Sequence, residues 1–189
     1  MRILNYEEFK LEKAQLIESV IKGAVFIYPT DTIYGIGCNA LNSKAVMKIR
    51  ELKDRFSNPF SVITPSKKWI YDHLVISKEA KKWIRKLPGP YTLILKMKTR
   101  CVAENINPKL SSLGVRIPKH WISQLAAESN VPIVTTSVNK SGQGFMTSLE
   151  DLDSSIKRGV EFAIYEGLKE GKPSKIVDLT AKAKVTERV

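Results

Sequence analysis

The sequence alternates irregularly between short apolar runs rich in β-branched residues and stretches in which apolar residues recur at helical spacing. The apolar runs cover residues 24–28, 61–64, 92–95, 114–117, 132–136, 162–165 and 175–179, lengths typical of buried strands. The helical stretches cover residues 6–22, 43–52, 77–86, 121–129 and 148–158. These spacings vary too much for a strict series of parallel β–α–β units. We therefore predict an α/β or α+β domain in which helices flank a twisted, mixed sheet.

The size and charge of the chain limit the number of domains and the kinds of ligand to be expected. With 189 residues, 43% of them hydrophobic, the chain can bury one sizeable core. No repeat or linker divides it, so we expect a single domain over residues 1–189. Lys and Arg number 31 against 19 Asp and Glu, a net charge of +12. A surface this basic attracts anions, so nucleotides and nucleic acids are candidate ligands.

The cysteines and the first residues indicate a soluble, cytoplasmic protein. Cys38 and Cys101 form no CxxC or Cys/His spacing, so neither a structural metal nor a disulfide framework is expected. The start of the chain carries early acidic residues and no uninterrupted apolar core, unlike a secretory signal. No apolar run reaches the roughly 20 residues that span a bilayer. His73 and His120 stand alone, which favours core or surface roles over ligand roles.

Polar clusters at the ends of the predicted strands are the candidates for chemistry. The sequence contains no GxxxxGK[ST], GxGxxG or HExxH signature, so any nucleotide is bound by other means. Lys53 and Arg55 end a predicted helix and face either solvent or one polyphosphate. Arg116 interrupts an apolar strand and needs an edge or an anionic partner. Residues 135–142 form either a plain turn or a ring of donors around phosphate or ribose oxygens.

Taken together and in this order, the clusters resemble the YrdC/Sua5 family of threonylcarbamoyl-AMP synthases over nearly the whole chain. The matching segments are residues 28–38 (YPTDTIYGIGC), Lys53 and Arg55, residues 88–92 (PGPYT), residues 114–118 (GVRIP) with His120, residues 136–142 (TSVNKSG), Pro173 with Ser174, and Arg188. The resemblance implies a single YrdC-like domain with a concave basic face. It also implies the short form of the family, without the extra domain of longer relatives.

The resemblance further implies a reaction and its partners. L-Threonine, bicarbonate and ATP would give threonylcarbamoyl-AMP and pyrophosphate, with Mg²⁺ bound through the ATP phosphates. The product would serve N6-threonylcarbamoyladenosine formation at adenosine 37 of tRNAs that read ANN codons, either by direct tRNA contact or through a transferase partner. A carbamate oxygen attacks the α-phosphate in this chemistry, so no protein nucleophile is required. Positioning and charge neutralisation are then the main catalytic devices.

Site residues follow from the resemblance position by position. The expected ATP ligands are Lys53, Arg55, Ser112, Ser137, Asn139 and Arg188, of which Lys53 and Arg55 are also the expected catalytic residues. The expected threonine ligands are Thr32, Thr64, Arg116, Thr135 and Ser174. Arg116 is assigned the amino acid's carboxylate, because a bidentate pair fixes orientation as well as affinity. Some relatives carry a threonine-binding His where this chain has Ile63 and Thr64.

Two other functions compete with the synthase. The positive charge would also suit an RNA-binding module, including one for double-stranded RNA, although no RNA-binding motif is present. A paralogue that keeps the ATP site but uses another acceptor is the second alternative, because the neighbourhood of Ile63 and Thr64 differs from that of some relatives.

Overall fold

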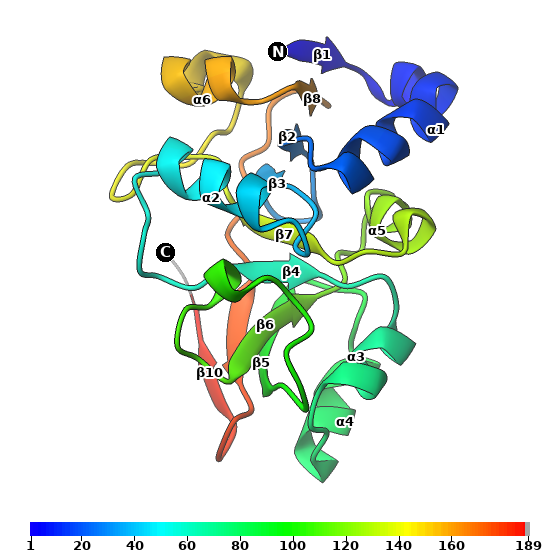
Figure 1. The fold of residues 1–189 in the computed structure, drawn as a ribbon, viewed down its shortest axis with the longest axis vertical. Helices are drawn as coiled ribbons and strands as arrows, with labels where there is room; N and C mark the ends of the chain where they lie inside the picture. Colours follow the sequence, from blue (N-terminus) through cyan, green and yellow to red (C-terminus); the bar gives the residue numbers. More distant parts are fainter. Residues whose placement is uncertain (188–189) are drawn as a thin grey trace.

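The computed structural model describes residues 1–187, which contain a mixed sheet with helices on both sides (Figure 1). The strands are β1 (Arg2–Leu4), β2 (Phe26–Tyr28), β3 (Gly35–Gly37), β4 (Ser61–Ile63), β5 (Tyr91–Lys96), β6 (Ser112–Arg116), β7 (Ile133–Ser137), β8 (Phe162–Ile164), β9 (Lys175–Asp178) and β10 (Lys184–Thr186). The helices are α1 (Tyr6–Lys22), α2 (Ser43–Leu52), α3 (Lys67–His73), α4 (Lys78–Arg85), α5 (Ser123–Ser129) and α6 (Ser154–Gly159). Two 3₁₀ turns, Glu104–Ile106 and Leu149–Asp151, complete the described elements.

The sheet mixes parallel and antiparallel pairs, as predicted. Its strand order is β1-β8-β2-β3-β7-β4-β6-β5-β9-β10. Four neighbouring pairs are parallel, namely β1 with β8, β8 with β2, β4 with β6, and β5 with β9. The antiparallel strand β7 joins the two halves of the sheet between β3 and β4. Strands far apart in sequence therefore end side by side.

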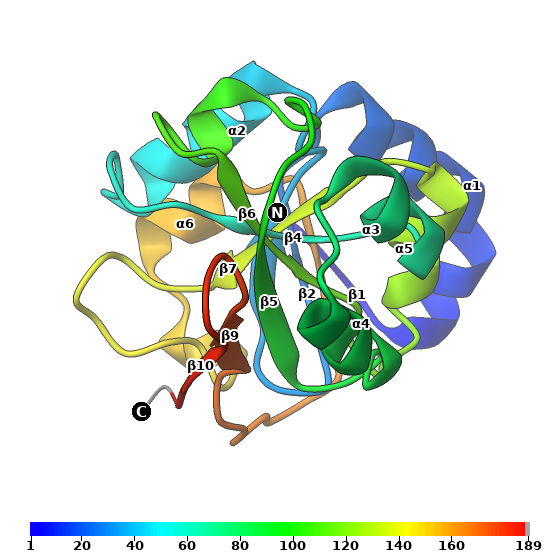
Figure 2. The same ribbon diagram turned by 90° about the horizontal axis from the view of Figure 1, so that it is seen from below.

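Two apolar clusters form the core on opposite sides of the sheet. Helices α1 and α5 cover one side, and α2 and α6 cover the other (Figures 1 and 2). The first cluster includes Phe9, Val20 and Leu125. The second includes Val46 from α2 and Ile156 from α6. Each helix thus buries its apolar stripe against the strands, which provides most of its stability.

Local signals set the limits of the first two helices. Asn5 and Glu8 form a capping box at the start of α1, and Gly23 ends it in the left-handed conformation at φ 107°. The Asn42 side chain accepts a hydrogen bond from the backbone of Ala45 and starts α2. The predicted limits of 6–22 and 43–52 are confirmed for both helices.

The predicted helix over 148–158 is confirmed only in its second part, where α6 lies. The segment holds a 3₁₀ turn over Leu149–Asp151 and then α6, because side chains start two separate elements there. Asp151 accepts hydrogen bonds from the backbone of Thr147 and Ser148, and Asp153 accepts from Ser155 and Ile156. The sequence pattern also missed β1, α3, β3 and β10.

The sequence pattern did not predict strand β3 because glycines make up most of it. A Cβ atom on Gly35 would lie 3.0 Å from the Tyr28 ring, and one on Gly37 would lie 2.2 Å from the Val134 carbonyl oxygen. Close packing of β2, β3 and β7 therefore excludes side chains here. This packing brings the loop between β2 and β3 beside the end of β7.

Candidate functional site

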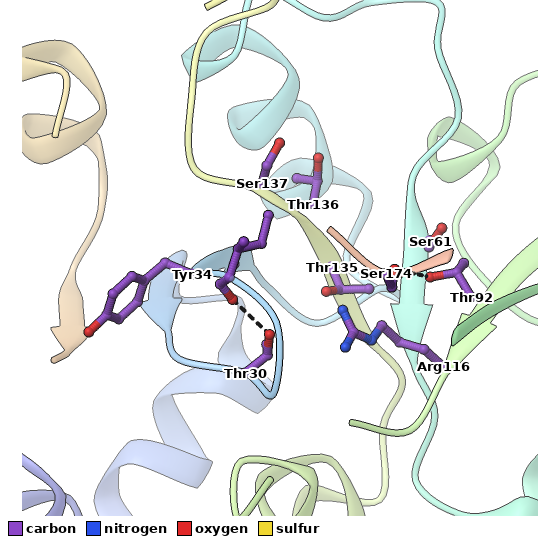
Figure 3. A pocket seen from close by; sticks show the side chains of 11 residues that line it. Thr30, Tyr34, Ser61, Thr92, Arg116, Thr135, Thr136, Ser137 and Ser174 are labelled. Carbon is purple, nitrogen blue, oxygen red and sulfur yellow. Dashed lines mark hydrogen bonds between the residues drawn. The ribbon is translucent and has the colours of Figure 1, made fainter. Parts of the chain in front are cut away.

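A pocket lies at the ends of the central strands and holds about 380 Å³ of space. Its lining comes from the β2–β3 loop, from β4 to β7 and from the residue that precedes β9 (Figure 3). The lining residues are Thr30, Ile33, Tyr34, Gly35, Ser61, Thr92, Arg116, Thr135, Thr136, Ser137 and Ser174. Hydroxyl groups and one guanidinium dominate this lining. We call it the hydroxyl pocket; its chemistry suits an anionic, oxygen-rich ligand.

Arg116 supplies the positive charge of the hydroxyl pocket. It is 5% exposed at the end of β6, and Figure 3 shows its guanidinium directed toward Thr135 and Thr30. Its Nη2 atom lies 2.6 Å from Asp31 Oδ1, and both Nη atoms lie 3.4 Å from Thr32 Oγ1. Burial lowers the pKa of Arg116 and the Asp31 charge opposes that shift, so the side chain stays cationic.

Residues 165–174, which we call the strap, close one side of the hydroxyl pocket. Tyr34 donates a hydrogen bond to the Gly167 carbonyl at 2.7 Å and accepts one from the Glu166 backbone at 3.0 Å. A Cβ atom on Gly171 would lie 1.8 Å from the Thr32 carbonyl oxygen, so the strap rests directly on the β2–β3 loop. At its end, Ser174 lies 2.8 Å from Thr92, oxygen to oxygen.

The side chains of His120 and Trp121 hold the strap in place through the carboxylate of Glu166. His120 Nε2 lies 3.1 Å from Glu166 Oε2, and Trp121 donates to Glu166 Oε1 at 2.5 Å. Partial burial lowers the pKa of His120, while Glu166 opposes the shift. His120, part of the motif that carried the resemblance, thus contacts the strap at Glu166 and does not line the hydroxyl pocket.

Lys53 lies beneath the turn after β7. Its ammonium donates to the carbonyls of Ser137 and Asn139 and to Asn139 Oδ1, the last two at 2.7 and 3.0 Å. The side chain is 1% exposed. Burial, with a smaller effect of the Arg55 charge, lowers the pKa of Lys53 to about 7. Lys53 therefore holds the Ser137–Asn139 turn in place in this structure.

Arg55 lies closer to the hydroxyl pocket. Its Nη1 atom lies 3.5 Å from the Thr136 hydroxyl, and its Nη2 atom donates to the Pro59 carbonyl at 3.0 Å. Arg50, which is 1% exposed, stabilises this loop by donating hydrogen bonds to the carbonyls of Arg55 and Asn58 at 2.6 and 3.2 Å. The loop is thus fixed so that Arg55 borders the β7 hydroxyls.

A second pocket adjoins the first. It holds about 500 Å³ and shares Ser61 with the hydroxyl pocket. Its lining residues are Pro59, Phe60, Ser61, Ile94, Leu110, Ser112, Gly114 and Asp178. This more apolar pocket, with a few polar groups, has the composition of a site for a ring system.

The structure brings most of the expected site residues together. Arg116, Thr135, Ser137 and Ser174 line the hydroxyl pocket. Around it lie Thr32, Lys53, Arg55 and Asn139, each through the contacts given above, and Ser112 lines the second pocket. Thr64 lines neither pocket: its backbone donates to the Arg116 carbonyl at 3.1 Å, and its hydroxyl is buried with no hydrogen-bond partner among residues 1–187. Arg188 lies outside the described residues.

Sequence reasoning gave no role to several lining residues. Thr30, Tyr34 and Thr92 lie inside the quoted segments 28–38 and 88–92, so the motifs held the signal. Ser61 reaches the pocket only through the register of β4, which places it opposite Gly114 and Thr135. No local pattern marks that position.

The fold and the pocket define a mixed α/β protein with a site for anionic, oxygen-rich ligands. Arg116 supplies the charge, and among the described lining residues there is no Cys, Lys or His to serve as a nucleophile. Cys38 is fully buried elsewhere, and burial raises the pKa of its thiol. The site is suited to binding and charge stabilisation.

Comparisons with known proteins identify the family. The Sua5/YciO/YrdC family model, described as telomere recombination, matches residues 18–188. A Methanocaldococcus jannaschii protein, provisionally named a threonylcarbamoyl-AMP synthase, is 38% identical over 93% of this chain and 84% of its own. The chain belongs to the Sua5/YciO/YrdC family, which confirms the resemblance drawn from the motifs.

Solved structures agree with the family assignment. Pyrococcus abyssi Sua5 complexed with L-threonine superposes with a TM-score of 0.85 at 29% identity, over 96% of this chain and 54% of that chain. Escherichia coli YciO, 24% identical, has the same fold with a TM-score of 0.85 over 99% of this chain and 94% of that chain. The chain thus spans about half of the P. abyssi protein and nearly all of YciO. No helix among residues 1–187 is long and apolar enough to cross a membrane.

Proposed function

We propose that this chain is an L-threonylcarbamoyladenylate synthase, a nucleotidyltransferase. The observation that carries the proposal is the hydroxyl pocket, in which the buried Arg116 guanidinium faces a row of hydroxyls beside Arg55. A relative of the same fold has been solved with L-threonine. An amino acid with one carboxylate, one amine and one hydroxyl matches a pocket with one cation and several hydroxyls.

Threonine and ATP occupy neighbouring places in this proposal. Arg116 binds the threonine carboxylate, and Thr32, Thr135 and Ser174 surround the rest of the amino acid. The phosphates lie along Arg55 and the Ser137–Asn139 turn, and the nucleoside extends into the second pocket at Ser112. Ser61, shared by both pockets, marks where the two substrates meet.

The reaction needs no protein nucleophile. The threonine amine combines with bicarbonate and loses water to give a carbamate. A carbamate oxygen attacks the α-phosphorus of ATP, the bond to the β-phosphate oxygen breaks, and pyrophosphate leaves. Arg55 and the turn donors stabilise the charge that develops on the phosphates. By binding the threonine carboxylate, Arg116 keeps the carbamate oxygen in line with the α-phosphorus, and this orientation contributes to the rate.

Magnesium is held mainly by the nucleotide in this proposal. None of the described residues that line the hydroxyl pocket is acidic, so phosphate oxygens of the nucleotide would hold the ion, and the pocket hydroxyls could serve as further oxygen ligands. It would supply charge neutralisation of the leaving pyrophosphate. We further propose that residues 1–189 act as one domain in the cytoplasm and that the adenylate is used to modify tRNA, directly or through a transferase partner.

Product analysis tests the proposal. The chain is incubated with ATP, ¹³C-bicarbonate and threonine, serine or valine, and the adenylates are identified by mass spectrometry while pyrophosphate is quantified. We expect labelled threonylcarbamoyl-AMP, with pyrophosphate release that depends on both threonine and bicarbonate. Arg55→Met and Arg116→Met should each lower turnover at least about 100-fold, as expected for loss of a group that contacts the reacting charges. Arg158→Met, on the exposed surface of α6, is the matched control. Release of pyrophosphate without threonine would overturn the proposal.

A paralogue with another acceptor is the second candidate. In the sequence alignment Escherichia coli YciO is 28% identical over 92% of this chain, against 24% in the longer structural superposition. Ile63 and Thr64 take the place of a threonine-binding His found in some relatives. The same panel of amino acids distinguishes the two functions. A labelled adenylate of another amino acid, formed faster than that of threonine, would support the paralogue.

A further inference from the structure

A row of residues on five neighbouring strands connects the hydroxyl pocket with the second pocket. Strand register pairs its members in turn, namely Asp178 of β9, Ile94 of β5, Gly114 of β6, Ser61 of β4 and Thr135 of β7. The first three line the second pocket, Thr135 lines the hydroxyl pocket, and Ser61 lines both. A ligand that occupies both pockets therefore lies along this row and has Asp178 at one end.

The length of this row suits a nucleotide. Three strand spacings separate Asp178 from Ser61, and neighbouring strands lie about 4.8 Å apart, so the span is roughly 14 Å. An extended nucleoside monophosphate has a similar length. Gly114 leaves the middle of the row open, since a Cβ atom there would lie 2.4 Å from Ser61 Oγ. A phosphate bound near Ser61 thus places the base beside Asp178.

Asp178 is the only charged residue among the described residues that line the second pocket. Its Oδ1 atom accepts hydrogen bonds from the backbone and the hydroxyl of Thr180 at 2.9 and 2.7 Å. These bonds lower the pKa of Asp178, with a smaller effect of the Lys184 charge, so the carboxylate is ionised. Oδ2 accepts no hydrogen bond from residues 1–187 and is not among their buried atoms that lack a partner, so a ligand can reach it.

We propose that Asp178 selects the base of the nucleotide, because its Oδ2 atom accepts a hydrogen bond from the 6-amino group of adenine. This inference rests on the proposed function and deepens it by naming the residue that distinguishes ATP from other purine nucleotides. Adenine presents a donor at position 6, whereas guanine and hypoxanthine present an acceptor there. An ionised carboxylate only accepts, so a 6-oxo base would leave Oδ2 without water and facing a second acceptor. Phe60, Ile94 and Leu110 supply the apolar surface for the ring.

Asp178→Asn inverts the polarity of this one position. The amide oxygen keeps the hydrogen bonds from Thr180, and the amide nitrogen takes the place of Oδ2 and offers a donor. Asp153→Asn is the matched control: Asp153 Oδ1 likewise accepts from the backbone and the hydroxyl of Ser155, two positions on, and Asp153 lines neither pocket. The measurement is threonine- and bicarbonate-dependent pyrophosphate release with ATP or with inosine triphosphate (ITP), which carries an oxygen in place of the 6-amino group. Both kcat/KM values and KM for threonine are determined, and thermal unfolding checks that each variant is folded.

The expected result is a change of nucleotide preference. The wild type and Asp153→Asn should use ATP at least about 100-fold better than ITP, since a site built for a donor rejects an analogue that lacks it. Asp178→Asn should lower kcat/KM for ATP about tenfold or more, the scale of a lost hydrogen bond to a charged group, and change KM for threonine less than about twofold. It should also raise kcat/KM for ITP, a gain that a loss of structure cannot produce.

Equal use of ATP and ITP by the wild type would overturn the inference. The same holds if Asp178→Asn leaves both kcat/KM values unchanged or lowers both equally, because Asp178 would then only hold the turn at Thr180. If Asp178→Asn does not fold, purine riboside triphosphate, which has only hydrogen at position 6, decides with the wild type. A kcat/KM equal to that of ATP refutes the inference, and a value between those of ATP and ITP supports it. A wild type that releases no threonine-dependent pyrophosphate with any of these nucleotides would instead refute the proposed function.

Discussion

Replacing Gly171 by Ala tests whether the strap forms part of the threonine site. The added Cβ atom would lie 1.8 Å from the Thr32 carbonyl oxygen and 2.8 Å from its carbonyl carbon. An ordinary contact needs about 3.4 Å, so the strap or the β2–β3 loop must shift by roughly 1.6 Å. A misplacement of about 1 Å in a positioning group lowers a rate about 100-fold. We therefore expect kcat/KM for threonine to fall about 100-fold, which equals about 2.7 kcal/mol.

The assay is pyrophosphate release with threonine varied at saturating ATP, and then with ATP varied. KM for ATP should change less than twofold, because Arg55 and the Ser137–Asn139 turn lie on other elements than the strap. Gly144→Ala is the matched control, since a Cβ atom there meets nothing within 4 Å. Unchanged kcat/KM for threonine in Gly171→Ala, in a variant with wild-type thermal stability, would refute the role given to the strap.

Two further predictions concern buried cations. Burial lowers the pKa of Lys53 from 10.5 to about 7, so above pH 7 the unfolded chain binds more protons and stability rises with pH. Relative to Lys53→Met, the wild-type free energy of unfolding should increase by up to about 1.4 kcal/mol per pH unit from pH 7 to 9 in urea titrations; equal slopes would contradict this. Arg50→Met should lower that free energy by about 3 kcal/mol, because the carbonyls of Asn105, Arg55, Asn58 and Ile106 lose their donor. It should also raise KM for ATP, and a stable Arg50→Met protein would contradict the prediction.

Elements with strong local signals were predictable from the sequence. Helix α1 has a capping box and a terminal glycine, and its limits of 6 and 22 followed from apolar spacing together with Gly23 as the C-terminal cap. Strands β4 to β7, which carry most of the site, were also predicted, although β6 begins at Ser112 instead of 114; β3, which contributes Gly35 to the pocket, was not. These elements bury continuous apolar runs, so period and composition agree with the final packing.

Elements that depend on distant partners were not predictable. Strand β1 has three residues and is a strand because it pairs with β8, some 160 positions later. Strand β3 consists of Gly35, Ile36 and Gly37; the two glycines lack strand propensity, and the strand is ordered by its pairing with β2 and β7. Both strands form because they pair with strands elsewhere in the sequence, and no short stretch of sequence contains that information.

The residues of the site were predictable, but the hydrogen bonds and ion pairs among them were not. The motif placed Lys53 and Arg55 together, yet Lys53 turns inward to the Ser137–Asn139 turn while Arg55 borders the Thr136 hydroxyl. The Asp31–Arg116 pair joins residues 85 positions apart. Spacing identifies which residues matter, whereas burial and hydrogen-bond geometry determine what each one does.

The strand order also sets when the protein can first act. Strand β8 lies between β1 and β2, and β9 lies beside β5, so late segments complete a sheet begun by early ones. A growing polypeptide that has not yet reached residue 162 leaves β1 without its partner and exposes the edge of β2. It also lacks the strap and Ser174, which close the hydroxyl pocket. A nascent chain that lacks these late segments therefore has an incomplete hydroxyl pocket.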